Sequence, residues 1–180
     1  MAYLRTRLCT WRMFRLWLLV VAVAAISAFP ASVDACIRLG SMALLLITQL
    51  RLWDDMADLP HDRVNHPDRV LVHAASLRSF QTVLAGMMIA TVVALLLQGD
   101  AWRLMTYAGL VSLLAFLYHG GLGAALGRGV QVALVLVKYP AIALLSAVGP
   151  PTPFGWSAAT VLFALLCAHE YVDHRRGALR

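Results

Sequence analysis

Five of the nine acidic residues of this chain lie within fifteen positions, from 54 to 68. At helical pitch Asp54, Asp58 and Asp62 recur every fourth residue, and Asp55 also shares a face with the last two, so these carboxylates could project to one side. Like charges this close repel one another unless a cation joins them. Oxygen-only clusters suit a hard ion, and Mg²⁺ is commonly held by a few carboxylates together with phosphate oxygens. The stretch therefore indicates Mg²⁺ with a diphosphate, and a solvated acidic loop between two helices is the plain alternative.

The composition of the chain places this stretch in a membrane protein. Of 180 residues 61% are hydrophobic and 13% are charged, and the mean hydropathy is +0.76, whereas a soluble domain has about 25% charged residues. The net charge of +6 does not indicate nucleic acid, because the basic residues flank apolar runs, where they set topology or contact anionic lipid. The three cysteines show no disulfide or metal spacing: Cys9, Cys36 and Cys167.

The apolar runs predict an all-α polytopic bundle that forms a single integral membrane domain over residues 1–180. Six transmembrane helices are expected, at about 14–30, 33–53, 75–98, 101–119, 130–148 and 154–173. Ser32 can cap the second helix, and Asp34 and Arg38 near its start can pair at i, i+4. Pro60 disfavours helix at the preceding residue, so Asp62 is expected beyond a break in the chain.

The arginines predict the orientation of these helices. With the N-terminus inside, most arginines fall in cytoplasmic segments, and the opposite side has only Arg38 and Arg103. Both termini and the loop 54–70 are then cytoplasmic, in the inner (plasma) membrane of the cell. The acidic ends of the second and sixth helices share that face, as in a repeated four-helix unit with a site between its copies.

The acidic stretch resembles the UbiA superfamily of intramembrane aromatic prenyltransferases. The first signature of that family is Asn/Asp-Asp-x-x-Asp-x-x-x-Asp followed by a sequence that contains Arg-Pro. This chain has Asp54-Asp55-x-x-Asp58-x-x-x-Asp62 and then His66-Pro67-Asp68-Arg69-Val-Leu71, with Val70 where the family has proline. The resemblance implies that the four aspartates hold Mg²⁺ ions bridging to a prenyl diphosphate and that Arg69 contacts the phosphate oxygens.

The second signature of the family closes its sixth helix, usually as Asp-x-x-x-Asp. Glu170-x-x-Asp173 stands in that place with spacing shorter by one, so it is either a second pair of metal ligands or a helix end that reaches water. Tyr118 and Lys138 fall on helices where the family contacts the diphosphate. A lysine within a span normally faces a cavity or a partner, and Lys138 reaches the phosphate side if Pro140 bends the helix or the span starts earlier.

The chemistry that the resemblance implies is Mg²⁺-dependent transfer of a prenyl group to an aromatic or other electron-rich acceptor inside the membrane. Asp55, Asp58, Asp62 and Lys138 would be catalytic, and Arg69, Tyr118 and Lys138 would bind the diphosphate. The partners would be a prenyl diphosphate, a hydrophobic acceptor and membrane lipid, with a homo- or hetero-oligomer also open. Family members usually have nine membrane helices, so with six expected spans the chain is a compact member, a partner-dependent member or a remnant.

Two other classes compete with this interpretation. His169-Glu170 followed by His174 suggests a zinc protease, but that motif needs histidines four apart on one helix face. Here they are five apart and diverge by roughly 140° at helical pitch, which excludes it. A non-catalytic membrane subunit that binds a cation or a partner through its acidic loop stays open, because Lys138 within a span fits that class as well.

Overall fold

A computed structural model describes residues 3, 6–7, 10–29, 32–120 and 127–178, with the side chains of Arg128 and of residues from 173 onward outside the description. Within these ranges the chain is helical and contains no strand. The helices are α1 (Trp11–Ser27), α2 (Val33–Ala57), α3 (Leu59–Asn65), α4 (Arg78–Gln98), α5 (Ala101–His119), α7 (Arg128–Leu136), α8 (Lys138–Ser146) and α9 (Pro153–Ala178). The prediction of an all-α bundle is confirmed for this part of the chain.

Four segments of the described chain are long and apolar enough to cross a membrane, where we expected six. They are α2, α4, α5 and the stretch Gly129–Ser146, which joins α7 and α8. The first expected span, α1, has 17 residues, fewer than the about 20 that normally cross a bilayer. The last, α9, runs on into a charged end and is not among the four. The fold is therefore that of a helical membrane protein with four candidate spans.

The second helix begins as expected and ends later than expected. The hydroxyl of Ser32 caps it by accepting a hydrogen bond from the backbone N–H of Ala35 at 3.2 Å, and Asp34 and Arg38 form the expected pair. The helix then continues to Ala57, past the predicted end at 53. Asp54 and Asp55 thus lie inside the last turn, where the neighbouring helices bury them.

A break before Asp62 is present, as predicted, but Leu59, where Pro60 was expected to disfavour helix, is itself helical. Helix α2 stops at Ala57, Asp58 lies between the two helices, and α3 begins at Leu59 with the proline in its first turn, where a missing N–H costs nothing. Asp62 belongs to α3, so the four aspartates do not share one straight helix.

The expected span 130–148 consists of two helices that meet at Val137. Pro140 explains the division, because it has no N–H to offer the carbonyl of Leu136 and its ring clashes with that carbonyl. Lys138 is the first residue of α8 and is buried. The fifth expected span is thus divided next to Lys138, and the reach of Lys138 to a phosphate stays a prediction.

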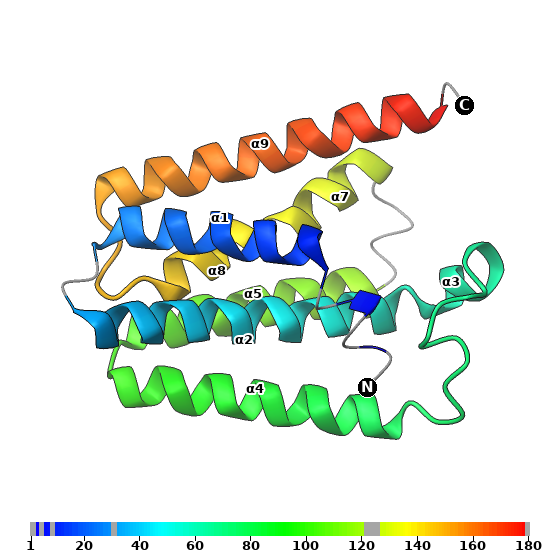
Figure 1. Cartoon of the computed structure of the whole chain (residues 1–180), viewed down its shortest axis with the longest axis horizontal. Helices are drawn as coiled ribbons and strands as arrows, with labels where there is room; N and C mark the ends of the chain where they lie inside the picture. The colour runs from blue at the N-terminus through cyan, green and yellow to red at the C-terminus, as the bar shows by residue number, and fades with distance from the viewer. Residues whose placement is uncertain (1–2, 4–5, 8–9, 30–31, 121–126, 179–180) are drawn as a thin grey trace.

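Helix α2 packs against α1, α4 and α8, while α9 packs against α1, α7 and α8 (Figure 1). At the contact of α1 with α9, a side chain added at Gly155 would come within 2.7 Å of Ser27. The hydroxyl of Thr152 also donates to the carbonyl of Ser27 at 3.1 Å. Small residues therefore allow these two backbones to approach closely.

A buried polar network joins α2, α4 and α5 in the middle of their spans. The amide nitrogen of Gln49 donates to the hydroxyl of Tyr107 at 2.8 Å, and the hydroxyl of Thr91 donates to the amide oxygen of Gln49 at 2.9 Å. All three side chains are buried. Polar groups inside a bilayer need internal partners, and this network supplies them.

Candidate functional site

The carboxylate of Asp54 is where three helices meet. It accepts hydrogen bonds from the hydroxyl of Tyr118 on α5 and from the ammonium of Lys138 at the start of α8. The ring of Trp53 lies edge-on to Tyr118 with centroids 5.6 Å apart. The ammonium of Lys138 also lies 5.2 Å from the ring centroid of Tyr139. The structure thus brings together three of the residues that the sequence assigned to one site, from positions 54, 118 and 138.

Asp55 faces a different set of groups, which we did not predict. Its carboxylate accepts a hydrogen bond from the hydroxyl of Tyr3 at 2.9 Å and lies 3.5 Å from a guanidinium nitrogen of Arg51 and 3.6 Å from one of Arg7. Tyr3 is buried and packs edge-on against Phe80 at 5.7 Å. Burial first, and then the charge of Asp55, raise the pKa of Tyr3 well above its ordinary value, so this hydroxyl stays a donor.

Asp62 pairs with Arg69 across the turn that follows α3. The guanidinium of Arg69 donates to both carboxylate oxygens, and the Asp62 side chain is buried. We predicted a metal ligand at position 62 and a phosphate contact at position 69. In this structure the two side chains neutralise each other, so a phosphate group at Arg69 would have to compete with the carboxylate of Asp62.

Asp58 differs from the other three aspartates. Its carboxylate makes no hydrogen bond or ion pair with the described residues, and it is exposed at the junction of α2 and α3. Desolvation at this end of the bundle, followed by the charges of Asp54, Asp62 and Asp55, raises the pKa of Asp58, and Arg69 opposes the rise. Asp58 therefore lies near three other carboxylates and has no ion-pair partner of its own among the described residues.

The four aspartates offer the oxygen donors that Mg²⁺ prefers. They do not converge on one point, since no three acidic, histidine or cysteine side chains of the described chain are grouped closely enough to form a metal centre. Mg²⁺ is, however, usually held by one or two carboxylates together with substrate phosphates, so a group of three is not required. Asp58 fits such a Mg²⁺ site together with Asp54, if Asp54 is freed from Lys138, or with Asp62, if Asp62 is freed from Arg69.

The second acidic pair lies elsewhere. Glu170 is exposed on α9 and lines a cavity of about 380 Å³ between α7 and α9, together with Gly129, Val132, Ala133, Leu136, Cys167 and Tyr171. In Figure 1 α7 lies between this end of α9 and α2. The side chain of Asp173 is outside the described residues. None of the four aspartates from 54 to 62 lines this cavity, so the approach of Asp173 to Asp58 stays a prediction.

Sequence reasoning missed the groups that complete the carboxylate environment. Arg51 lies four residues before Asp55, a spacing that predicts an ion pair on a helix. Tyr3 and Arg7 contact the same carboxylate although they lie about fifty positions earlier in the sequence. No local sequence pattern predicts such a contact. No family model, curated protein or solved structure matches this chain, so the resemblance to the UbiA superfamily rests on the residues quoted above.

Proposed function

We propose that this protein binds a prenyl diphosphate with Mg²⁺ at the end of α2 and transfers the prenyl group to a hydrophobic, electron-rich acceptor within the membrane. The observation that supports it best is the meeting of Asp54, Tyr118 and Lys138 beside Asp58, a carboxylate that has no ion-pair partner among the described residues. Mg²⁺ would neutralise carboxylates at this place, and the diphosphate would neutralise the ammonium of Lys138.

The cationic and the acidic side chains would have different roles in the reaction. Lys138 and Arg69 would exchange their carboxylate partners for phosphate oxygens and stabilise the negative charge that grows as the allylic C–O bond breaks. Asp54 and Asp62, released from those cations, would face Mg²⁺ together with Asp58, and the bound ion would neutralise the leaving diphosphate. The apolar bundle would keep water from the prenyl cation until a new bond to the acceptor forms and the acceptor loses a proton.

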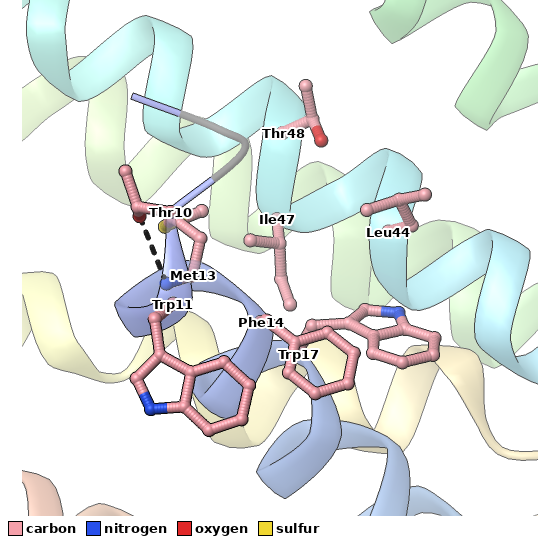
Figure 2. A pocket seen from close by; sticks show the side chains of 8 residues that line it. All are labelled: Thr10, Trp11, Met13, Phe14, Trp17, Leu44, Ile47 and Thr48. Atoms are coloured by element: carbon pink, nitrogen blue, oxygen red, sulfur yellow. Dashed lines mark hydrogen bonds between the residues drawn. The ribbon is translucent and has the colours of Figure 1, made fainter. Parts of the chain in front are cut away.

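A second candidate is a non-catalytic membrane subunit, and one observation favours it. Three of the four aspartates are already neutralised by side chains of the chain itself: Asp54 by Lys138, Asp55 by Arg51 and Arg7, and Asp62 by Arg69. Neither the cavity between α7 and α9 nor one of about 480 Å³ between α1 and α2 (Figure 2) is lined by an aspartate of this stretch. In this candidate the ion pairs are structural: Lys138 with Asp54 connects α8 to α2, and the other pairs hold the ends of α2 and α3.

Binding of a labelled prenyl diphosphate to the purified protein in detergent distinguishes the two candidates. The proposal expects binding that needs Mg²⁺, is abolished by a chelator and is not competed by inorganic phosphate. It also expects a prenylated product, detected by mass spectrometry, when candidate aromatic acceptors are added. Binding that is the same with and without Mg²⁺ would remove the transferase from consideration.

Matched variants locate the binding. Asp58→Asn should abolish Mg²⁺-dependent binding, whereas Asp34→Asn, the same change at the opposite end of α2, should leave it intact. Asp34 is exposed and pairs only with Arg38 among the described residues. If Asp58→Asn binds prenyl diphosphate as strongly as the unchanged protein, the ligand lies elsewhere and the second candidate is favoured.

A further inference from the structure

The cavity between α7 and α9 contains a charged group that the proposed reaction does not use. Its volume of about 380 Å³ falls within the range of about 300–1,000 Å³ that is typical of small-molecule sites. The walls are Gly129, Val132, Ala133 and Leu136 on α7 and Cys167, Glu170 and Tyr171 on α9. The cavity between α1 and α2, by contrast, is lined by aromatic, aliphatic and threonine side chains (Figure 2), so none of its described lining residues selects a ligand by charge.

Small residues on α7 leave the space that this cavity occupies. The lining positions recur at i, i+3, i+4 and i+7 on α7 and at i, i+3 and i+4 on α9, so each set lies along one side of its helix. Position 129 has no side chain, and a Cβ added there would meet nothing within 4 Å. Ala133, about one turn later, is also small. The missing bulk on α7 therefore leaves room for a ligand against α9.

Glu170 gives this cavity a negative charge. It is the one charged residue among the described lining positions, and its exposed side chain forms no ion pair with a described basic residue. Tyr171 lines the cavity next to it. Aromatic rings attract a cation that lies over their face within about 6 Å of the ring centroid. The cavity thus offers a carboxylate, an aromatic ring and apolar walls to a single ligand.

These groups select a ligand that has a positive charge on an apolar body. A divalent metal ion needs several oxygen ligands, and no three acidic, histidine or cysteine side chains of the described chain are grouped to hold one. An anionic ligand would be repelled by Glu170, and a neutral one would gain nothing from it. We propose that the cavity between α7 and α9 binds a small hydrophobic ammonium compound, with its cationic nitrogen at Glu170 and Tyr171 and its apolar part against Val132 and Leu136. No aspartate of the acidic cluster lines this cavity, so the proposal is independent of Mg²⁺ and of the diphosphate.

Protection of Cys167 from alkylation tests the proposal. The delipidated protein in a non-ionic detergent is treated with N-ethylmaleimide, and mass spectrometry of its peptides follows Cys167 in the cavity and Cys36, an exposed thiol near the start of α2, as the internal control. Benzyltrimethylammonium should slow the labelling of Cys167 and leave that of Cys36 unchanged. Its neutral isostere, neopentylbenzene, should need a roughly fivefold higher free concentration for half protection, since an exposed ion pair and an exposed cation–π contact each raise affinity only a few-fold.

Matched variants locate the binding. Glu170→Gln should make the two compounds equal, Glu170→Asp should keep part of the difference, and Asp34→Asn, which removes an exposed carboxylate far from the cavity, should keep all of it. Gly129→Trp adds bulk where an added side chain meets open space and should abolish protection by both compounds. Gly129→Cys in a Cys167→Ser background places the thiol on the facing wall, where benzyltrimethylammonium should protect it in the same way.

Five results would overturn the proposal. The neutral isostere could protect Cys167 as well as the cation does, Glu170→Gln could keep the preference, or Cys36 could be protected equally. Protection of Cys167 by Mg²⁺ alone would make Glu170 a metal ligand. Protection by phosphatidylcholine and not by benzyltrimethylammonium would assign the cavity to a lipid headgroup.

Discussion

Lys138 donates a hydrogen bond to the carboxylate of Asp54, although 84 positions separate them, and both side chains are buried. The contact joins the start of α8 to the last turn of α2, next to the hydroxyl of Tyr118. An uncompensated charge in this environment is costly, so the two residues are expected to depend on each other energetically.

Lys138→Met should therefore destabilise the protein as well as weaken diphosphate binding. Breaking a buried pair by removing one partner costs about 3–5 kcal/mol, because the remaining charge is left unpaired. Adding Asp54→Asn to the same protein should recover much of the loss. Thermal unfolding in detergent of the two single variants and the double variant measures the coupling. Strictly additive losses would show that the two groups act independently.

Asp58→Asn should behave in the opposite way. Its partly desolvated position and the nearby carboxylates raise the pKa of Asp58, so the folded protein holds a proton here more strongly than the unfolded chain does. The charged form costs stability once the pH exceeds the raised pKa, and the cost disappears as the pH falls below the unfolded value. The variant should thus gain slight stability at neutral pH and none in acid, which unfolding at several pH values can follow. A stability loss at neutral pH would contradict this assignment.

Asp55→Asn should release the segment that contains Tyr3 and Arg7. The substitution removes the charge that holds two guanidinium groups and weakens the acceptor for the Tyr3 hydroxyl. Faster trypsin cleavage after Arg7, or faster hydrogen exchange there, is the expected result. Tyr3→Phe is the milder control, because it removes one hydrogen bond and keeps both ion pairs. Unchanged cleavage in Asp55→Asn would mean that other contacts hold this segment.

Gly155→Ala and Gly86→Ala form a matched pair for the packing of α9. A methyl group at position 155 would lie 2.7 Å from Ser27, whereas one at position 86 meets nothing within 4 Å. Overpacking commonly costs about 1–3 kcal/mol, and replacing an exposed helical glycine by alanine gains up to about 1 kcal/mol. The first variant should unfold at a lower temperature than the unchanged protein and the second at an equal or higher one. Equal behaviour would refute the close contact of α1 with α9.

The expected orientation can be tested at Asn65, which is exposed at the end of α3. In a variant without the native cysteines, Asn65→Cys should react with an impermeant thiol reagent only from the cytoplasmic side, because the arginines gather at this end of the bundle. Asp34→Cys, at the other end of α2, should react only from the opposite side. Labelling of position 65 from the opposite side alone would reverse the topology.

Local sequence patterns predicted the features that depend on neighbouring residues. The helix over 101–119, the cap at Ser32, the pair of Asp34 with Arg38 and the break before Pro60 all follow from apolar runs, hydrogen-bonding side chains and the geometry of proline. Each needs only residues within about one turn of the chain. The structure confirms them for that reason.

Contacts between distant segments could not be predicted in the same way. Nothing near Asp55 in the sequence points to Tyr3, and Gln49 is 42 positions from Thr91 and 58 from Tyr107. A bend at Pro140 was one of two alternatives for the fifth span, whose continuous apolar run gave no sign of a division at Val137. That the carboxylates are the chemically important group stays a prediction, and their neutralisation by arginine and lysine depends on three-dimensional packing.

The network of Gln49, Thr91 and Tyr107 also determines which way the end of α2 faces. Successive residues of a helix are about 100° apart around its axis, so a rotation of α2 by one residue would turn the amide of Gln49 away from both hydrogen-bond partners. These directional bonds therefore fix the rotation of α2 about its own axis. The directions in which Asp54 and Asp58 project are thus set by a residue one to three turns earlier in the sequence. A substitution at Gln49 would reorient the acidic cluster although Gln49 does not contact it.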